Sequence, residues 1–446
     1  MKQLLAYCLS IILCVSFTGC MENYLDLYPE DKITSASFPE NESDIKLLLN
    51  GVYAQLREKE VYNQGLFGFG ITDGATPNAF NWGTDEVFNK LGAGRLSSSD
   101  GGVVTHRWKR CYEIISRANY LLACMDLVDL SEEAKAKYSG ETHFLRGLAY
   151  SVLAETYGGV PIILTNISTE EARSLKRASL EETWQQALDD YEVAITNLGV
   201  DAPEPGRATK GAALGMKMRA YLYQGKYKEV LSCVEQIDAL KKYGLFHSYE
   251  GLFDPANENN KEVLFDIQYI EGENSQGSYI DQYCGTGTGS WTRGSRYVPT
   301  DDLVAAYETI DGSPVDPENP YENRDPRLGF TAVLPGSYFL GYRFPNYLYP
   351  GGAFNHAGNR LKHLSTRKYR IQDESKLPPS GQSYINDIIL RYADVLLSKA
   401  EAIIETNGNV ADAIAILNRI RTERDDVKIS LLPTSMSREE AREKVR

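Results

Sequence analysis

Two stretches of this sequence combine aromatic rings with planar polar side chains and lack the periodicity of a helix or a strand. They are residues 73–85 and residues 282–297. The C–H face of a sugar stacks on tryptophan or tyrosine, while amide, carboxylate and guanidinium groups match its hydroxyls. We therefore expect a saccharide-binding platform on loops, with these candidate residues: Asn81, Trp82, Tyr283, Trp291, Arg293 and Tyr297.

Local packing is the alternative role for these aromatic residues, because rings in long loops often attach the loop to the rest of the fold. Trp82 and Trp291 are open to either interpretation. A third aromatic stretch, residues 338–354, favours packing or contact with a partner. Trp108 and Trp184 lie in helical patterns and are expected in the core.

No motif in the sequence indicates catalysis, and we predict no catalytic residue, metal site or cofactor. The glycine-rich residues 285–289 are followed by Ser290, where a dinucleotide-binding motif requires its third glycine. Residues 206–211 have the span of a phosphate-binding loop, but Ala212 replaces its lysine. The five histidines lack metal-ligand spacing. A glycosidase carboxylate pair stays open, since 61 acidic residues always include pairs at a suitable separation.

The composition is acidic and rich in tyrosine. A formal net charge of −14 argues against a nucleic-acid partner, because such partners require clustered lysine and arginine. The 29 tyrosines outnumber the 14 phenylalanines, so much of the aromatic surface carries a hydroxyl group. This composition suits a wet, polar binding surface and an uncharged or mixed ligand.

The N-terminus has the features of an export signal. Lys2 precedes an apolar run over residues 4–17, which is shorter than the ~20 residues of a membrane-spanning helix. Small residues then precede Cys20, as in bacterial lipoprotein signals; an ordinary signal peptide with an incidental cysteine is the alternative. We expect residues 1–19 to be removed, Cys20 to carry lipid, and residues 20–40 to form a polar tether.

A helical scaffold is expected to position the aromatic loops. Phe144, Leu148 and Val152 recur every four positions, which is the spacing of one buried helix face. Gly158 and Gly159 should end this helix, because glycine adopts left-handed conformations and the following proline cannot continue a helix. Other expected helices cover residues 42–57, 105–127, 180–198, 212–224, 226–240, 387–405 and 411–423, and a strand covers residues 261–270.

Two predicted helical hairpins repeat one pattern. Apolar residues follow Gly225 and Gly408 at identical offsets: Tyr227, Val230, Val234 and Ile237 in the first copy, and Val410, Ala413, Leu417 and Ile420 in the second. The pattern is similar to the tetratricopeptide helix-turn-helix unit. Because the copies are far apart in the sequence, they indicate hairpins of one framework and not a tandem array.

Several motifs resemble the SusD/RagB family of surface lipoproteins of Bacteroidetes. FLRGLAYSVLAETYGGVPIIL, from residue 144, is similar to the family signature FLRALAY…LYGDVPL. Further similar motifs follow the family's order: RANYLL, KEVLFDIQYI, NRDPRL, LRYADVLLSKAEA and ILNRIRTER. The resemblance covers almost the whole chain after Cys20.

The resemblance implies a mainly α-helical, tetratricopeptide-like fold with a long irregular lobe and a few short strands. It implies a lipid tether on the outer face of the outer membrane, where the protein would cover a SusC-like TonB-dependent transporter and deliver an oligosaccharide for uptake, without a covalent step. Family members also draw binding aromatics from loops in the two zones above. Peptide or glycopeptide capture, as in RagB-type members, is the alternative, whereas a tetratricopeptide scaffold without a ligand would need no lipid anchor.

The resemblance also divides the mature chain into two regions. Residues 41–242 correspond to the family's N-terminal helical region, and residues 243–446 to its C-terminal region. The C-terminal region consists of an irregular lobe over residues 243–386 and a helical hairpin over residues 387–424.

A last helix is expected near the end of the chain. Ser437 should cap it, and Glu440 should pair with Lys444 four residues later. Family members continue beyond this point, so we expect the chain to be truncated. The cysteines outside the export signal show no pairing or metal-binding pattern and are expected to be buried free thiols: Cys111, Cys124, Cys233 and Cys284.

Overall fold

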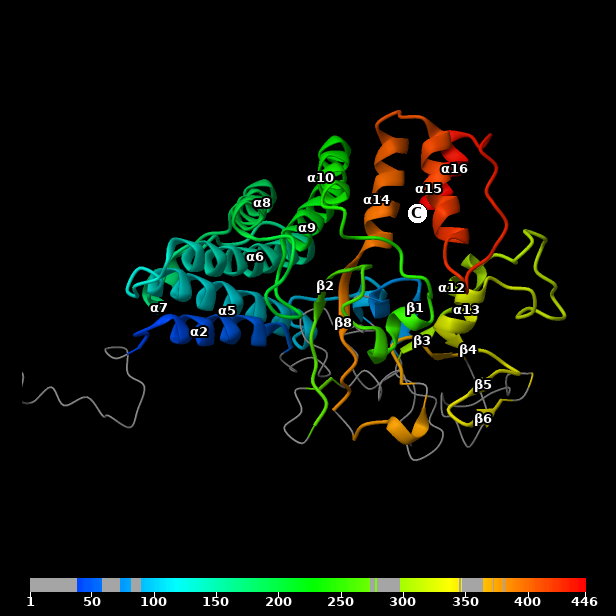
Figure 1. The fold of residues 1–446 in the computed structure, drawn as a ribbon, viewed down its shortest axis with the longest axis horizontal. Coiled ribbons are helices and arrows are strands. Elements are labelled where there is room, and N and C mark those ends of the chain that lie inside the picture. The colour runs from blue at the N-terminus through cyan, green and yellow to red at the C-terminus, as the bar shows by residue number, and fades with distance from the viewer. Residues whose placement is uncertain are drawn as a thin grey trace, which may run out of the picture.

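A computed structural model describes most of the chain. The described residues are 38–57, 73–81, 90–272, 277–278, 297–344, 346, 364–371, 373–379 and 382–446. Cys20 and Cys284 lie outside them. Within these ranges helices predominate over short strands, which confirms the predicted mainly α-helical fold (Figure 1). No helix among the described residues is long and apolar enough to cross a membrane.

The first helices form a layered bundle around α6. They are α2 (Glu42–Ala54), continued by the 3-10 turn η1 (Gln55–Arg57), then α5 (Val103–Cys124), α6 (Glu132–Tyr157), α7 (Thr169–Ser174) and α8 (Leu180–Asn197). Helix α6 packs against α5 and α8, and Phe144, Leu148 and Val152 are buried as predicted. The helix ends at Gly158, whose φ of 75° is a conformation that favours glycine.

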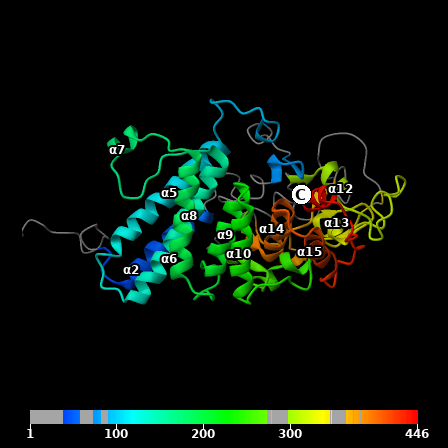
Figure 2. The same cartoon turned by 90° about the horizontal axis from the view of Figure 1, so that it is seen from above.

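The two predicted hairpins lie side by side beyond this bundle. They are α9 (Lys210–Tyr223) with α10 (Tyr227–Ala239), and α14 (Tyr392–Glu405) with α15 (Val410–Thr422). Helix α10 packs against α14, so segments distant in the sequence become neighbours (Figures 1 and 2). Val230, Val234, Ala413 and Leu417 are buried, and this confirms the prediction of two hairpins in one framework.

Short antiparallel strand pairs among the described residues lie within the irregular lobe or connect it to segments outside it. The pairs are β1 (Ala79–Asn81) with β3 (Tyr297–Pro299), β2 (Val263–Ile267) with β8 (Asp387–Arg391), β4 (Ala332–Val333) with β7 (Ser365–Thr366), and β5 (Tyr338–Phe339) with β6 (Tyr342–Arg343). Short helices accompany them: η2 (Asp73–Ala75), η3 (Gly251–Phe253), η4 (Pro255–Asn257), α12 (Asp301–Ala306), α13 (Pro326–Thr331) and η5 (Glu374–Lys376).

The predicted helix over residues 387–405 is wrong at its start, because residues 387–391 form β8 and the helix begins at Tyr392. Ile388, Ile389 and Leu390 form a branched apolar run that suits a strand, and β2 supplies the partner. Leu390 is 1% exposed in the helical core. The β2–β8 pair therefore joins the lobe to the helices.

The last described helix, α16 (Arg438–Val445), has the predicted cap, but its predicted internal ion pair is wrong. The Ser437 backbone N–H donates to Glu440 Oε2 at 2.7 Å, which completes a capping box. Lys444 pairs instead with Glu308. The Glu440 carboxylate is occupied at the helix start, while Glu308 offers Lys444 a partner from the lobe.

Several other predictions for buried residues are confirmed. Trp184 is 6% exposed, and Trp108 packs against the core with its ring 5.2 Å from that of Tyr157. Cys111, Cys124 and Cys233 are buried free thiols.

A buried ionic contact connects the second hairpin to the lobe. Arg424 donates from both terminal nitrogens to the Glu262 carboxylate, at 2.7 and 2.8 Å. Arg391 donates to the same carboxylate at 2.9 Å. Glu262 is fully buried, and Arg424 is 2% exposed. One carboxylate therefore holds two guanidinium groups, from the end of α15 and from β8.

Candidate saccharide-binding site

The strand pair β1–β3 brings the ends of the two predicted aromatic stretches together. Asn81 lies directly opposite Tyr297 in this pair, and Phe80 lies opposite Val298. The Thr300 backbone N–H also donates to the Asn78 carbonyl at 3.1 Å, which extends the contact. Two segments more than two hundred residues apart in the sequence thus meet at one edge.

The side chains of the predicted platform are only partly within the described part of the chain. Four of the six candidates lie outside it: Trp82, Tyr283, Trp291 and Arg293. The other two, Asn81 and Tyr297, are placed by their backbones in β1 and β3. Trp82 directly follows Asn81 in the sequence, and the second stretch ends at Tyr297. Phe80, in the same strand as Asn81, exposes 41% of its surface.

The third aromatic stretch divides into packed and exposed residues where it is described. Phe339 and Phe344 are each 2% exposed and pack with Val333 and Leu340 in a small cluster. Tyr338 is 67% exposed. The packing interpretation therefore holds for the two phenylalanines, whereas Tyr338 is exposed and is not part of the cluster.

A polar cavity of about 360 Å³ lies beside η2, which packs against β1. We call it the η2 cavity; its charged lining residues are Asp73, Arg219, Lys368, Asp387, Arg391 and Asp394. Burial, together with the charges of Asp73 and Asp266, raises the pKa of Asp387 to about 7. No sequence signal predicts this cavity, because its residues come from η2, α9, β8, α14 and the segment after β7.

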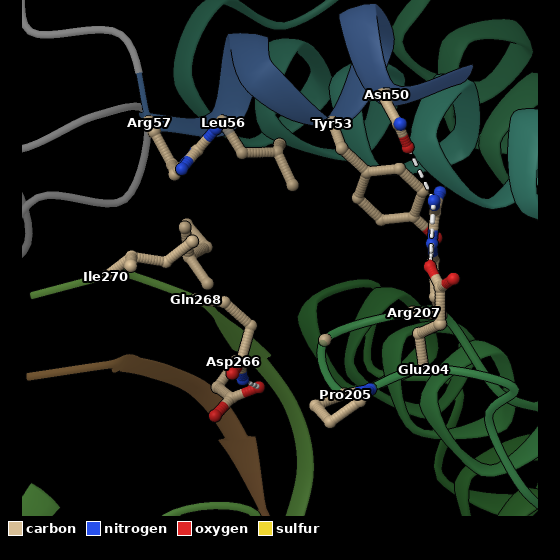
Figure 3. Close-up of a pocket in the computed structure, with 12 residues that line it drawn as sticks. Asn50, Tyr53, Leu56, Arg57, Glu204, Pro205, Arg207, Asp266, Gln268 and Ile270 are labelled. Atoms are coloured by element: carbon tan, nitrogen blue, oxygen red, sulfur yellow. Dashed lines mark hydrogen bonds and ion pairs between the residues drawn. The ribbon is translucent and has the colours of Figure 1, made fainter. Parts of the chain in front are cut away.

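A second cavity, of about 400 Å³, lies between α2 and β2 (Figure 3). Arg207 donates to Asn50 Oδ1 at 2.5 Å, and its guanidinium lies 4.9 Å from the centre of the Tyr53 ring. On the opposite wall, Gln268 donates to Asp266 at 2.7 Å, and burial raises the pKa of Asp266 to about 6. The polar groups of this cavity thus bind one another.

Two family models match this chain. One, described as SusD family, matches residues 261–446, and the other, described as starch-binding associating with outer membrane, matches residues 23–222. The chain belongs to the SusD family. SusD-like protein P25 of Formosa agariphila is 26% identical, over 94% of this chain and 81% of its own length.

Solved structures agree with this membership in the SusD family. A SusD-like carbohydrate-binding protein from Bacteroides fragilis is 26% identical, with a TM-score of 0.79 over 91% of this chain and 82% of that chain. A laminarin-binding SusD-like protein is 20% identical, with a TM-score of 0.68 over 91% of this chain and 88% of that chain, and shows likeness of fold.

The motifs that carry the SusD resemblance have structural roles where they are described. In NRDPRL, Asp325 caps α13, and Arg324 donates to the carbonyls of Val304 and Tyr307 at 2.5 and 2.7 Å. In ILNRIRTER, Arg424 holds the buried Glu262. These motifs therefore stabilise the scaffold, and none of them lies in the β1–β3 edge.

Proposed function

We propose that this protein binds a saccharide on a platform formed at the β1–β3 edge by residues of the two aromatic stretches. The observation that supports this most directly is the pairing of Asn81 with Tyr297. Because of this pairing, the residue that precedes Trp82 lies next to the end of the stretch that contains Trp291. Stacking of a sugar's C–H face on an aromatic ring removes apolar surface from water, so two rings on one platform would strengthen binding together.

The similar proteins support a carbohydrate as the ligand. The family model over the first part of the chain is described as starch-binding, and the Bacteroides fragilis relative as carbohydrate-binding. We extend this to the uptake role implied by the family resemblance: a lipoprotein anchored through Cys20 at the outer membrane, which passes its ligand to a SusC-like transporter. This role requires capture and release, and no covalent step.

Calorimetric titration of the protein against a panel of oligosaccharides tests the proposal. Trp82→Ala and Trp291→Ala should each weaken saturable binding by at least about tenfold, which corresponds to 1.4 kcal/mol. Tyr338→Ala is the matched control, because Tyr338 is an exposed aromatic of the same lobe, outside the platform. Chromatography of the ligand afterwards should show no product.

Two results would contradict the proposal. If both tryptophan variants bind as tightly as the unsubstituted protein, the platform does not lie at the β1–β3 edge and both rings have a packing role. Binding of peptides without binding of any saccharide would replace the carbohydrate function with peptide capture.

A further inference from the structure

We propose that the η2 cavity holds an anionic substituent, a carboxylate or a sulfate ester, of the saccharide bound on the β1–β3 platform. The ligand would then be an acidic saccharide. This inference rests on the proposed function and deepens it, since it names the ligand class.

The position of the cavity suits an extension of the platform. Asp73 lines the cavity and opens η2, which packs against β1. The chain from Asp73 to Ala79 therefore leads directly from the cavity to the platform edge. A volume of about 360 Å³ exceeds what a carboxylate or sulfate group needs, so part of a sugar ring fits with it.

Three cations line the cavity, and they are neutralised to different extents. Arg219 is satisfied locally, because it donates to Asp394 at 2.5 Å and to the Ile389 carbonyl at 3.0 Å. Arg391 shares its carboxylate partner, Glu262, with the two donor bonds of Arg424. Two guanidinium groups on one carboxylate leave one positive charge uncompensated at the cavity wall.

Lys368 adds a second charge, for which the described part of the chain supplies no carboxylate partner. Its ammonium lies 4.3 Å from the centre of the Phe253 ring, and no described carboxylate forms an ion pair with it. The neighbouring phenol of Tyr249 responds to this local field. Burial alone would raise the pKa of Tyr249, yet Lys368, Arg391 and Arg327 lower it below the usual value.

The acidic residues of the cavity are Asp73, Asp387 and Asp394; Asp73 offsets at most one of the two uncompensated positive charges, so a positive charge remains. Asp394 is paired with Arg219. Burial and the charges of Asp73 and Asp266 raise the pKa of Asp387 to about 7, so near neutral pH part of the population carries a protonated carboxyl that can donate a hydrogen bond to an anion. The net charge of −14 opposes an anionic ligand mainly through distant surface charges. Salt screens these distant charges strongly, but it screens the neighbouring, partly buried charges of the cavity much less.

Titration calorimetry with matched ligand pairs tests the inference. One pair is an oligogalacturonate and its methyl ester, and the other is a sulfated and an unsulfated laminari-oligosaccharide of equal length. At least one acidic ligand should bind about tenfold more tightly than its neutral counterpart, as expected for one charge-assisted hydrogen bond. The pair that shows the preference identifies carboxylate or sulfate as the group.

Variants of Lys368 connect the preference to the cavity. Lys368→Met should abolish it, while Lys368→Arg retains the charge and should preserve it. Lys376→Met is the control, since the Lys376 side chain is 71% exposed in the same lobe. The inference is overturned, and the proposed function is kept, if acidic and neutral ligands bind equally or if Lys368→Met keeps the preference. If no saccharide binds, both the inference and the proposed function are overturned.

Discussion

Replacement of Arg424 by methionine should destabilise the protein by about 3–5 kcal/mol, the range expected when a buried ion pair loses one partner. Arg424 is 2% exposed and Glu262 is fully buried, so water cannot replace the two hydrogen bonds lost to Glu262, or the one lost to the Phe246 carbonyl at 2.7 Å. Arg391 would still donate to Glu262 at 2.9 Å. This remaining contact places the expected loss toward the lower end of the range.

Urea unfolding followed by circular dichroism measures the change. With a slope of about 3 kcal/mol per molar urea, the midpoint should fall by about 1 M or more. Arg419→Met, in α15 shortly before Arg424, is the matched control, because Arg419 and its partner Glu423 have side chains that are 41% and 39% exposed. Such exposed pairs contribute about 0.5 kcal/mol or less.

A double variant separates the ion pair from general packing. Glu262→Gln combined with Arg424→Met removes both charged partners, so it should lose less stability than the sum of the single variants, by about 1–3 kcal/mol. Additive losses would refute the interpretation of Glu262 and Arg424 as one coupled unit. A midpoint shift in Arg424→Met equal to that in Arg419→Met would refute the predicted magnitude.

Three further perturbations have defined outcomes. Gly159→Ala should lower the thermal midpoint by several degrees, because the added Cβ would lie 2.0 Å from the Ala178 carbonyl oxygen. Gly199→Ala is the control and should leave the midpoint unchanged, because its Cβ would lie 3.5 Å from the nearest atom. Equal midpoints for the two variants would contradict the prediction. The pKa of Asp387 is raised above the unfolded value of 3.8 to about 7, so its contribution to stability is complete below about pH 4 and is lost as the pH rises through 7. Asp387→Asn should therefore flatten the decline in thermal midpoint between pH 5 and pH 8, and an unchanged slope would exclude this carboxyl as a source. Burial raises the pKa of the Cys111 thiol to about 12, so it should react with a thiol reagent at pH 8 only after unfolding; rapid labelling of the native protein at this residue, located by mass spectrometry, would contradict its burial.

The helical part of the fold was largely predictable, because its signals are local in the sequence. The apolar spacing of Phe144, Leu148 and Val152 and the stop at Gly158 lie within one segment, and α6 follows them. Ser179 and Ser437 likewise cap the helices that follow them, because a capping box involves only four consecutive residues.

Two predictions about segments that contact a distant partner were wrong. The run Asp387–Arg391 is a strand because β2, far earlier in the chain, supplies the hydrogen-bonding edge. Lys444 pairs with Glu308 of the lobe, although Glu440 is nearer in the sequence. Local spacing cannot predict such contacts, since they exist only after the segments have packed.

The same distinction applies to the candidate site. The residue types of the two aromatic stretches, Asn81 and Trp82 in one and Trp291 and Tyr297 in the other, were evident from the sequence alone, as were the helical class and the family resemblance. The tertiary structure alone decided that Asn81 lies opposite Tyr297, and that Lys368 and Arg391 face one cavity beside η2. Residue chemistry and helix periodicity are properties of short segments, whereas a binding surface is made by segments that meet only when the chain folds.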